Sequence, residues 1–277
     1  MIPLYILTHN RPDRQTTFEN LPPKWREMVT FVVQQNAPVP LCADHSRVLV
    51  LPHGITNLHQ TRQYLLDHVH YEHAIELDDD VVFSRRRVDQ PTKFSKMLYQ
   101  DFDDMFNGLD QALKTHPLAG VVAREGANRN TEEYLYATRQ MRVHAINSTW
   151  LRSEGLRWDL LRSPGPEDFC MLLQSLTRGF SNVVLNDYCQ NQGGSNTSGG
   201  CSTYRTPEVH ADACYHLEEL FPKFVTVVDK TTKAAWGGGT RKDVRVQWKK
   251  ALEHGLAEQR RQNLSSGTEE VAGGDYE

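Results

Sequence analysis

The sequence has few cysteines, no long apolar run and no excess of positive charge, and each absence argues against a class of protein or fails to indicate one. The five cysteines of the 277-residue chain are odd in number and scattered, and no two have CxxC spacing. This distribution argues against a zinc site and against a disulfide framework. No segment approaches the roughly 20 apolar residues of a transmembrane helix. The start of the chain, MIPLYILTHNRPD, lacks the basic segment and long apolar core of a signal peptide, so we expect a cytoplasmic protein.

The formal net charge of −4 does not by itself indicate a nucleic-acid-binding protein. The charge is unevenly distributed, because the last fifteen residues, NLSSGTEEVAGGDYE, contain four acids and no base. Without them the chain is nearly neutral, so local basic groups can still matter. Small, polar and acidic residues favour disorder. We therefore predict a single domain over residues 1–262 and an acidic, disordered tail over residues 263–277.

Short apolar runs alternate with helical patterns along the chain. The runs predict strands at 2–7, 28–33, 47–52 and 73–77, and a stripe of leucines predicts a helix over 56–69. Further strands are expected at 118–123, 142–151, 181–187 and 224–229, and further helices at 101–115, 166–179 and 207–222. This alternation is typical of the α/β class, here a Rossmann-like, mostly parallel central sheet flanked by helices.

Polar loops follow three of the first four predicted strands: THNRPD, PHGITN and DDDVVFSRRR. In open α/β sheets, ligands bind at the carboxyl ends of the strands. We therefore expect the three loops to meet at one edge of the sheet and to form one site.

Three consecutive aspartates, Asp78, Asp79 and Asp80, open the last of these loops. Alternate residues of a strand share a face, so Asp78 and Asp80 are expected on one side. Two carboxylates on one side suit a hard divalent cation such as Mg²⁺ or Mn²⁺, which would neutralise a leaving diphosphate. The alternative is a solvated acidic turn paired with Arg85–Arg87.

The order of these motifs resembles glycosyltransferases of the GT-A fold over residues 1 to about 230. The segment LTHNRPD ends the first strand, the aspartates look like the DxD motif, and PGPEDF at 164–169 looks like the xED motif. The resemblance implies a GT-A-like sheet and a DxD motif that holds a nucleotide-sugar through its ribose and its metal-bound diphosphate. It also implies that Asp168, with Glu167 as the neighbouring alternative, is the general base of an inverting transfer. A helix N-terminus lowers a carboxyl pKa, so Asp168 is expected to be ionised, although plain helix capping also explains these acids.

The same resemblance assigns the donor side of the site. Thr8, Asn10 and Arg11 would contact the base and ribose, together with Asp78 and Asp79. Arg62 would reach the diphosphate, unless it lies on a solvated helix face. The loop GGSNTSGG, with Gly193, Gly194 and Ser195, would order over the donor through its backbone N–H groups, unless it is an ordinary surface loop.

The metal is expected at Asp80, with Asp78 or Asp79 nearby. A histidine late in the chain supplies a further ligand in many GT-A enzymes. His210 is the first candidate for that ligand and His216 the second, although a single histidine on a helix is more often structural or exposed.

A narrower resemblance rests on QNQGGSNTSGGCSTYRT and WGGGTRKDVRVQWKK. These segments look like the TET-associated glycosyltransferases of bacteriophages, which implies a 5-hydroxymethylcytosine acceptor in DNA and a UDP-glucose or UDP-GlcNAc type of donor. DNA phosphates need basic residues, and a flipped base needs an aromatic contact. The candidates are Arg85–Arg87, Arg139, Arg142, Arg152, Arg157, Arg162, Arg241, Lys242, Arg245, Lys249 and Lys250, with Trp150, Trp158, Trp236 and Trp248.

Three other functions stay open. The GT-A machinery could serve a protein, glycan or small-molecule acceptor. The chain could be a non-catalytic module that binds a nucleotide-sugar or DNA. It could also be a metal-dependent phosphoryl-transfer enzyme, although the sequence lacks the GxxxxGK[ST] spacing of a P-loop. The oligomeric state is not readable from the sequence.

Overall fold

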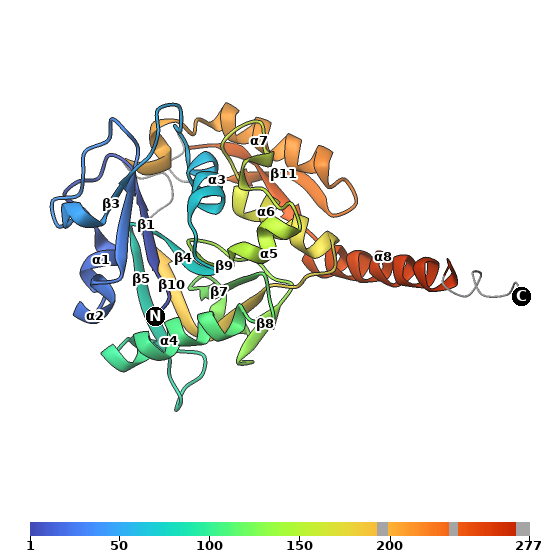
Figure 1. The fold of residues 1–277 in the computed structure, drawn as a ribbon, viewed down its shortest axis with the longest axis horizontal. Helices are drawn as coiled ribbons and strands as arrows, with labels where there is room; N and C mark the ends of the chain where they lie inside the picture. The colour runs from blue at the N-terminus through green and yellow to red at the C-terminus, as the bar shows by residue number, and fades with distance from the viewer. Residues whose placement is uncertain (193–198, 233–237, 270–277) are drawn as a thin grey trace, which may run out of the picture.

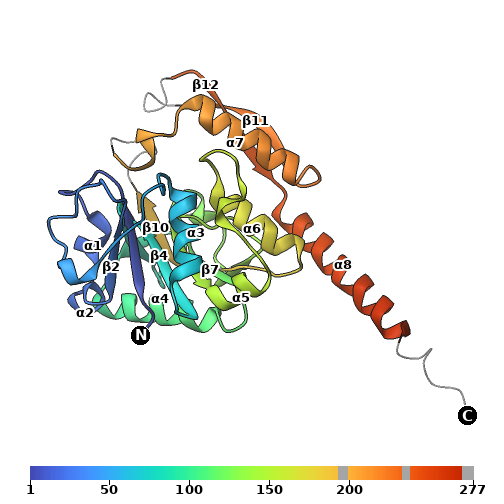
Figure 2. The same ribbon diagram turned by 45° about the horizontal axis from the view of Figure 1, so that its top comes forward.

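A computed structural model describes residues 1–192, 199–232 and 238–269. A large sheet forms its centre, helices cover both faces, and helix α8 (Trp248–Glu269) projects away from the body (Figures 1 and 2). None of the helices in these ranges is long and apolar enough to cross a membrane.

The ten-stranded sheet has the order β3-β2-β1-β4-β9-β7-β10-β5-β6, and β8 pairs with β10. Neighbouring strands β3, β2, β1 and β4 are parallel, as are β7 and β10, whereas β9 is antiparallel to both β4 and β7. The predicted α/β fold with a mostly parallel central sheet is therefore confirmed. The strands are β1 (Leu4–Thr8), β2 (Val29–Val33), β3 (Val48–Val50), β4 (His73–Asp78), β5 (Val81–Arg86), β6 (Phe94–Lys96), β7 (Leu118–Ala123), β8 (Tyr134–Tyr136), β9 (Val143–Asn147) and β10 (Val183–Gln192).

Both faces of the sheet are buried, which explains why its central strands are mainly apolar. In β1, Tyr5 and Leu7 join one core cluster, whereas Leu4 and Ile6 join the other. The first cluster includes side chains from α3 (Leu58–His68), α5 (Ser148–Ser153) and α6 (Glu167–Thr177). The second includes side chains from α4 (Tyr99–Ala112) and from α2 (Pro23–Arg26), which follows the short α1 (Thr16–Asn20).

Two predicted segments differ from the structure. The strand expected over 142–151 ends at Asn147, whose side chain accepts a hydrogen bond from Trp150 N at 2.9 Å and so caps α5. The stretch after the aspartates, expected as a loop, is strand β5, because its apolar residues pair with β10 and β6.

The C-terminal part forms a separate unit above the carboxyl ends of the strands (Figure 2). Helix α7 (Pro207–Leu220) packs on an antiparallel hairpin, β11 (Val225–Thr231) and β12 (Thr240–Val246), which is not part of the central sheet. Helix α8 continues through residues 263–269, the beginning of the segment expected to be a tail. Residues 270–277 lie outside the described residues.

Candidate functional site

A cavity of about 850 Å³ lies at the carboxyl ends of β1, β3 and β4. The first loop contributes Thr8, His9 and Arg11, and the third contributes the three aspartates. The second loop contributes only its flanking residues, Leu51 and Leu58. The start of α6, the segment before β9, residues 199–205 and the β11–β12 hairpin complete the wall.

Arginines from distant parts of the chain hold the three aspartates. Asp79 is buried, and its carboxylate accepts hydrogen bonds from Thr8 Oγ1 at 2.6 Å and Arg11 Nη1 at 2.5 Å. Arg11 Nη1 also donates to Asp80 Oδ2 at 3.0 Å, and Arg62 Nη2 donates to Asp78 Oδ1 at 3.2 Å. The repulsion between adjacent carboxylates is thus offset by Arg11 and Arg62.

The arginines that follow the aspartates in sequence do not have this role. Arg85 pairs with Asp101, Arg86 donates to Asn186 O at 3.0 Å, and Arg87 pairs with Asp89 at 2.6 Å. The alternative that Arg85–Arg87 balance the aspartates is therefore wrong, because strand β5 carries these side chains away from the cavity.

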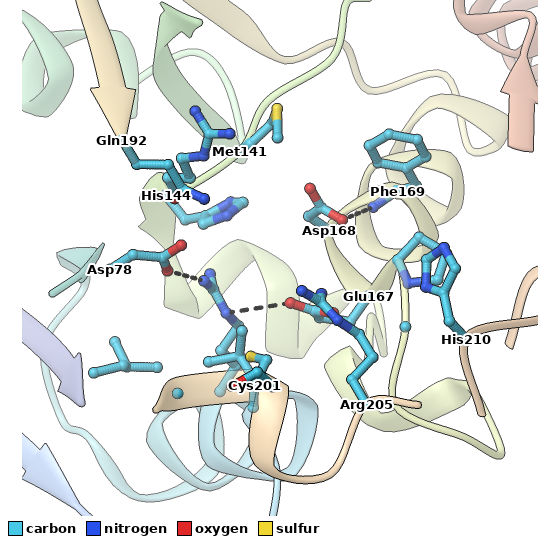
Figure 3. A pocket seen from close by; sticks show the side chains of 18 of the residues that line it. Asp78, Met141, His144, Glu167, Asp168, Phe169, Gln192, Cys201, Arg205 and His210 are labelled. Carbon is cyan, nitrogen blue, oxygen red and sulfur yellow. Dashed lines mark hydrogen bonds and ion pairs between the residues drawn. The ribbon is translucent and has the colours of Figure 1, made fainter. Parts of the chain in front are cut away.

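Arg62 connects the two acidic parts of the site. Its side chain is only 1% exposed, so a solvated helix face is ruled out. Its guanidinium lies 3.2 Å from Glu76 Oε2 on β4, 3.2 Å from Asp78 Oδ1, and 4.0 Å from Glu167 Oε1 on α6. Figure 3 shows Asp78 and Glu167 on opposite sides of this part of the cavity.

Burial raises the pKa values of the carboxyl groups around this arginine. The pKa of Glu76 rises to about 7, that of Asp78 to about 6 and that of Glu167 to about 7, although Arg62 opposes each shift. Burial also raises the pKa of Asp168, and this effect exceeds the opposite effects of Arg139, Arg62 and the backbone N–H groups at the start of α6. The prediction of a lowered pKa for Asp168 is therefore wrong, because the loss of hydration outweighs the effect of the helix N-terminus.

The sequence did not predict His144, which lines the cavity, or Glu76, which supports the site through its ion pair with Arg62. Glu76 lies two positions before Asp78, so both side chains are on the same face of the strand. An acid within an otherwise apolar strand could have indicated a buried charged group near the site. His144 pairs with Glu76 across β4 and β9 and lies edge-on to Trp158 at 5.3 Å. Burial lowers the pKa of His144 well below its usual value, so this ring is neutral.

The expected donor residues differ in their placement. Thr8 and Arg11 line the cavity, whereas Asn10 is exposed on its edge with a positive φ of 54° and bonds to the His9 ring at 3.0 Å. Gly193, Gly194 and Ser195 lie outside the described residues. The last residues of the segment GGSNTSGG, Gly199 and Gly200, do line the cavity. Gly200 N donates a hydrogen bond to His9 O at 2.9 Å, which attaches this backbone to the end of β1.

The carboxylates fit a divalent cation in part. Among the described residues, arginines donate to one oxygen each of Asp78 and Asp80, whereas both oxygens of Asp79 accept hydrogen bonds. Carboxylate oxygens are suitable donors for Mg²⁺ or Mn²⁺, which take few protein ligands when phosphates supply others. Across residues 1–192, 199–232 and 238–269, no three His, Cys, Asp or Glu side chains form a group that could hold a metal ion.

The two histidine candidates therefore do not complete such a group. His210 is buried on α7 and lies on the Glu167 side of the cavity, across from Asp78 (Figure 3). Burial and the nearby Arg241 lower the pKa of His210 to about 4, which keeps the ring neutral. His216 is elsewhere on α7, where its Nδ1 accepts a hydrogen bond from Arg162 N at 3.0 Å.

Some of the predicted basic and aromatic residues reach the cavity and others do not. Its wall includes Arg139, Arg142, Arg241, Arg245 and Trp248. The others have different environments. Arg152 donates to Leu66 O, and three others form ion pairs: Arg157 with Asp159, Arg162 with Asp212, and Lys242 with Asp229. Lys249 and Lys250 are exposed on α8. Trp158 is buried, Trp150 packs on Phe180, and Trp236 lies outside the described residues.

Three solved structures illustrate how far the overall likeness to known proteins extends. TarS 1–349 of S. aureus, in complex with UDP-GlcNAc, has a TM-score of 0.47 and 11% identity, over 79% of this chain and 65% of that chain. A mycobacterial protein has a TM-score of 0.46 and 11% identity, over 89% and 84%. The glycosyltransferase GlyE of Streptococcus pneumoniae has a TM-score of 0.33 and 13% identity, over 56% and 36%. The chain thus spans less than two thirds of the TarS fragment, and these weak likenesses do not bear on its function.

The sequence itself is more informative. No curated protein sequence matches the chain. A family profile described as TET-Associated Glycosyltransferase matches residues 2–200, which include the aspartates of β4 and the acids that open α6. Because this match covers well over half of the 277 residues, the chain belongs to the TET-associated glycosyltransferase family.

Proposed function

We propose that this glycosyltransferase moves a sugar from a nucleotide-sugar, of the UDP-sugar type, to the hydroxyl group of 5-hydroxymethylcytosine in DNA, with inversion. One observation carries the proposal: the aspartates of β4 and the acids of α6 line the same cavity, and Arg62 contacts both groups. Such a transfer requires a neutralised leaving diphosphate, a deprotonated acceptor hydroxyl and the exclusion of water.

The donor half would lie at the ends of β1 and β4. Asp78 and Asp80 would hold Mn²⁺ or Mg²⁺, which would supply positive charge to the leaving diphosphate. Thr8 and Arg11 hold the Asp79 carboxylate in place through bonds of 2.6 and 2.5 Å. The backbone around Gly199 and Gly200 would lie close to the donor, because these residues pack directly on Arg11.

The acceptor half would lie at the start of α6, with Asp168 as the base. Its carboxylate would take the proton of the acceptor hydroxyl while that oxygen bonds to the anomeric carbon and the bond from this carbon to the diphosphate oxygen breaks. A pKa raised above the ordinary aspartate value makes Asp168 a better proton acceptor. Glu167 is less suited because its carboxylate is directed at Arg62.

The DNA acceptor is supported by the family and by the charge of the wall. Arg139, Arg142, Arg241 and Arg245 all reach the cavity, and Trp248 is beside them. Arginines bind the phosphates of a strand, and a buried base must leave its stack to reach a catalytic group.

The direct test measures UDP release from UDP-glucose and UDP-GlcNAc with Mn²⁺. We expect release with DNA that contains 5-hydroxymethylcytosine and none with the same DNA unmodified. Release with a glycan, protein or small-molecule acceptor but not with this DNA would reassign the acceptor. If the protein binds the donor but releases no UDP with any acceptor, it is a non-catalytic module.

A pair of isosteric variants tests the base. Asp168→Asn should lower kcat by about 10²- to 10⁴-fold, the usual contribution of a general base, and Glu167→Gln should lower it less. Donor binding, followed by the thermal shift that the UDP-sugar produces, should survive in Asp168→Asn. If this variant transfers sugar at the wild-type rate, Asp168 is not the base.

A further inference from the structure

Two arginines on the cavity wall differ from all those that hold the catalytic carboxylates. Arg139 and Arg245 are exposed and line the cavity. Neither side chain forms a hydrogen bond or an ion pair with any residue that the structure describes, whereas the side chains of Arg11 and Arg62 are both bound to carboxylates. A guanidinium group has five N–H donors, so both side chains keep their donors available for a ligand.

Arg139 is displayed by a rigid segment. Thr138 exchanges two hydrogen bonds with the buried Asn182, at 3.2 and 2.9 Å, and Gln140 donates to Ala119 O at 2.6 Å. The neighbours of Arg139 on both sides are therefore fixed, while its own side chain is directed to the cavity. Such fixation lowers the entropy lost when the arginine binds a ligand.

The backbone of the same segment is strained. Among the non-glycine residues in the described part of the chain, a positive φ occurs at Asn10, Ala137 and Arg142, and the last two flank Arg139. Conformations of this kind cost about 1 to 3 kcal/mol and cluster at functional sites. Arg142 O also accepts a hydrogen bond from Asp78 N at 3.0 Å, so the strained segment is attached to the aspartate motif.

An aromatic pair adjoins Arg139. The Arg139 guanidinium carbon lies 4.8 Å from the centre of the Phe169 ring, and this ring meets Trp248 edge to face at 5.1 Å. Phe169 directly follows Asp168, and Figure 3 shows the two residues side by side. Trp248 lies three positions after Arg245, so the pair brings α6 and the C-terminal unit together next to the proposed base.

We propose that Arg139 and Arg245 bind backbone phosphates of the acceptor strand, next to the nucleotide whose base enters the cavity, with Phe169 and Trp248 as the adjacent apolar contact. This rests on the proposed function, because it assumes a polynucleotide acceptor. Guanidinium groups match phosphate oxygens in geometry, and most protein contacts to nucleic acid are made to phosphate and sugar. Arg245 and Trp248 lie outside residues 2–200, so the C-terminal unit contributes part of this surface.

The test measures the affinity of the full-length protein for a fluorescent oligonucleotide that contains 5-hydroxymethylcytosine, at increasing NaCl. Each lost phosphate contact lowers the slope of log affinity against log salt by about 0.7 on a single strand and about 0.9 on a duplex. We expect this reduction in Arg139→Ala and in Arg245→Ala, and about twice the reduction in the double variant. Arg139→Lys should restore most of the slope, since it keeps the charge.

Arg260→Ala is the matched control, because Arg260 is exposed on α8 and does not line the cavity. It should leave the slope unchanged. An unchanged slope in both Arg139→Ala and Arg245→Ala, or a weaker affinity for the UDP-sugar alone, would overturn the proposal and assign these arginines to other ligands. The two proposals fail separately. If the wild-type protein glycosylates the DNA but the variants have the wild-type salt slope, only the phosphate contacts are contradicted. If the wild-type protein and the variants bind DNA with the expected salt slopes but the wild type transfers no sugar, only the proposed function is contradicted.

Discussion

Glu76 offers a quantitative test of the buried charge network. Its side chain is 1% exposed, its Oε1 accepts no hydrogen bond from any described residue, and burial raises its pKa from the ordinary 4.5 to about 7. A carboxyl whose pKa is higher in the folded than in the unfolded state takes up protons on folding. The free energy of unfolding therefore decreases as the pH rises from about 4.5 to about 7.

The magnitude follows from the size of the shift. A shift from 4.5 to about 7 corresponds to roughly 3 kcal/mol, at about 1.4 kcal/mol per pH unit. Glu76→Gln replaces the carboxyl with a neutral group of the same shape. We expect this variant to be more stable than wild type by about 3 kcal/mol at pH 8 and by less than about 1 kcal/mol at pH 5.

Urea unfolding at pH 5, 6, 7 and 8, followed by tryptophan fluorescence, measures this difference. Glu72→Gln is the control, because Glu72 is exposed just before the same strand and should follow wild type at every pH. If Glu76→Gln and wild type lose stability in parallel between pH 5 and pH 8, Glu76 does not titrate there and the burial argument is refuted.

Three further outcomes are expected. In the pH profile of kcat, activity should fall at low pH as the Asp168 carboxyl takes up a proton, with a midpoint above the ordinary aspartate pKa of 3.8. A midpoint at or below pH 3.8 would show that the titrating group is not Asp168. Thr8→Val should lower the free energy of unfolding by about 1 to 3 kcal/mol in urea, because it removes the 2.6 Å hydrogen bond to the buried Asp79; wild-type stability would show that this bond contributes nothing. Gly200→Ala should lower the melting temperature, since φ is +60° and the added Cβ would lie 3.0 Å from Arg11 Nη2; an unchanged melting temperature would show that the backbone there adapts freely.

The sequence determined the secondary structure and the class of the fold to a large extent. Mainly apolar runs at 2–7, 28–33 and 73–77 correspond to strands β1, β2 and β4, because a strand buried on both faces is rich in apolar residues. The stripe over 56–69 corresponds to α3 (Leu58–His68). The sequence also located the acidic motifs at the end of β4 and at the start of α6, both within the residues that the family profile matches.

Secondary structure was less predictable where two elements follow one another without a break. The segment 142–151, RVHAINSTWL, resembles one strand from its residues, yet the side chain of Asn147 caps a helix there. The hairpin strand at 225–231 also looks like a sheet strand, and only its pairing with β12 separates it from the central sheet. Local patterns give the type of an element, but its partner depends on the rest of the chain.

Only the tertiary structure decided the electrostatics of the site. Asp79 is balanced by Arg11, 68 positions away, rather than by the arginines that follow it in sequence. The pKa of Asp168 rises because folding removes water from its carboxyl group, an effect that its helix position does not reveal. Periodicity and motif order are local properties of a sequence, whereas ion pairing and dehydration arise between residues that meet only when the chain has folded.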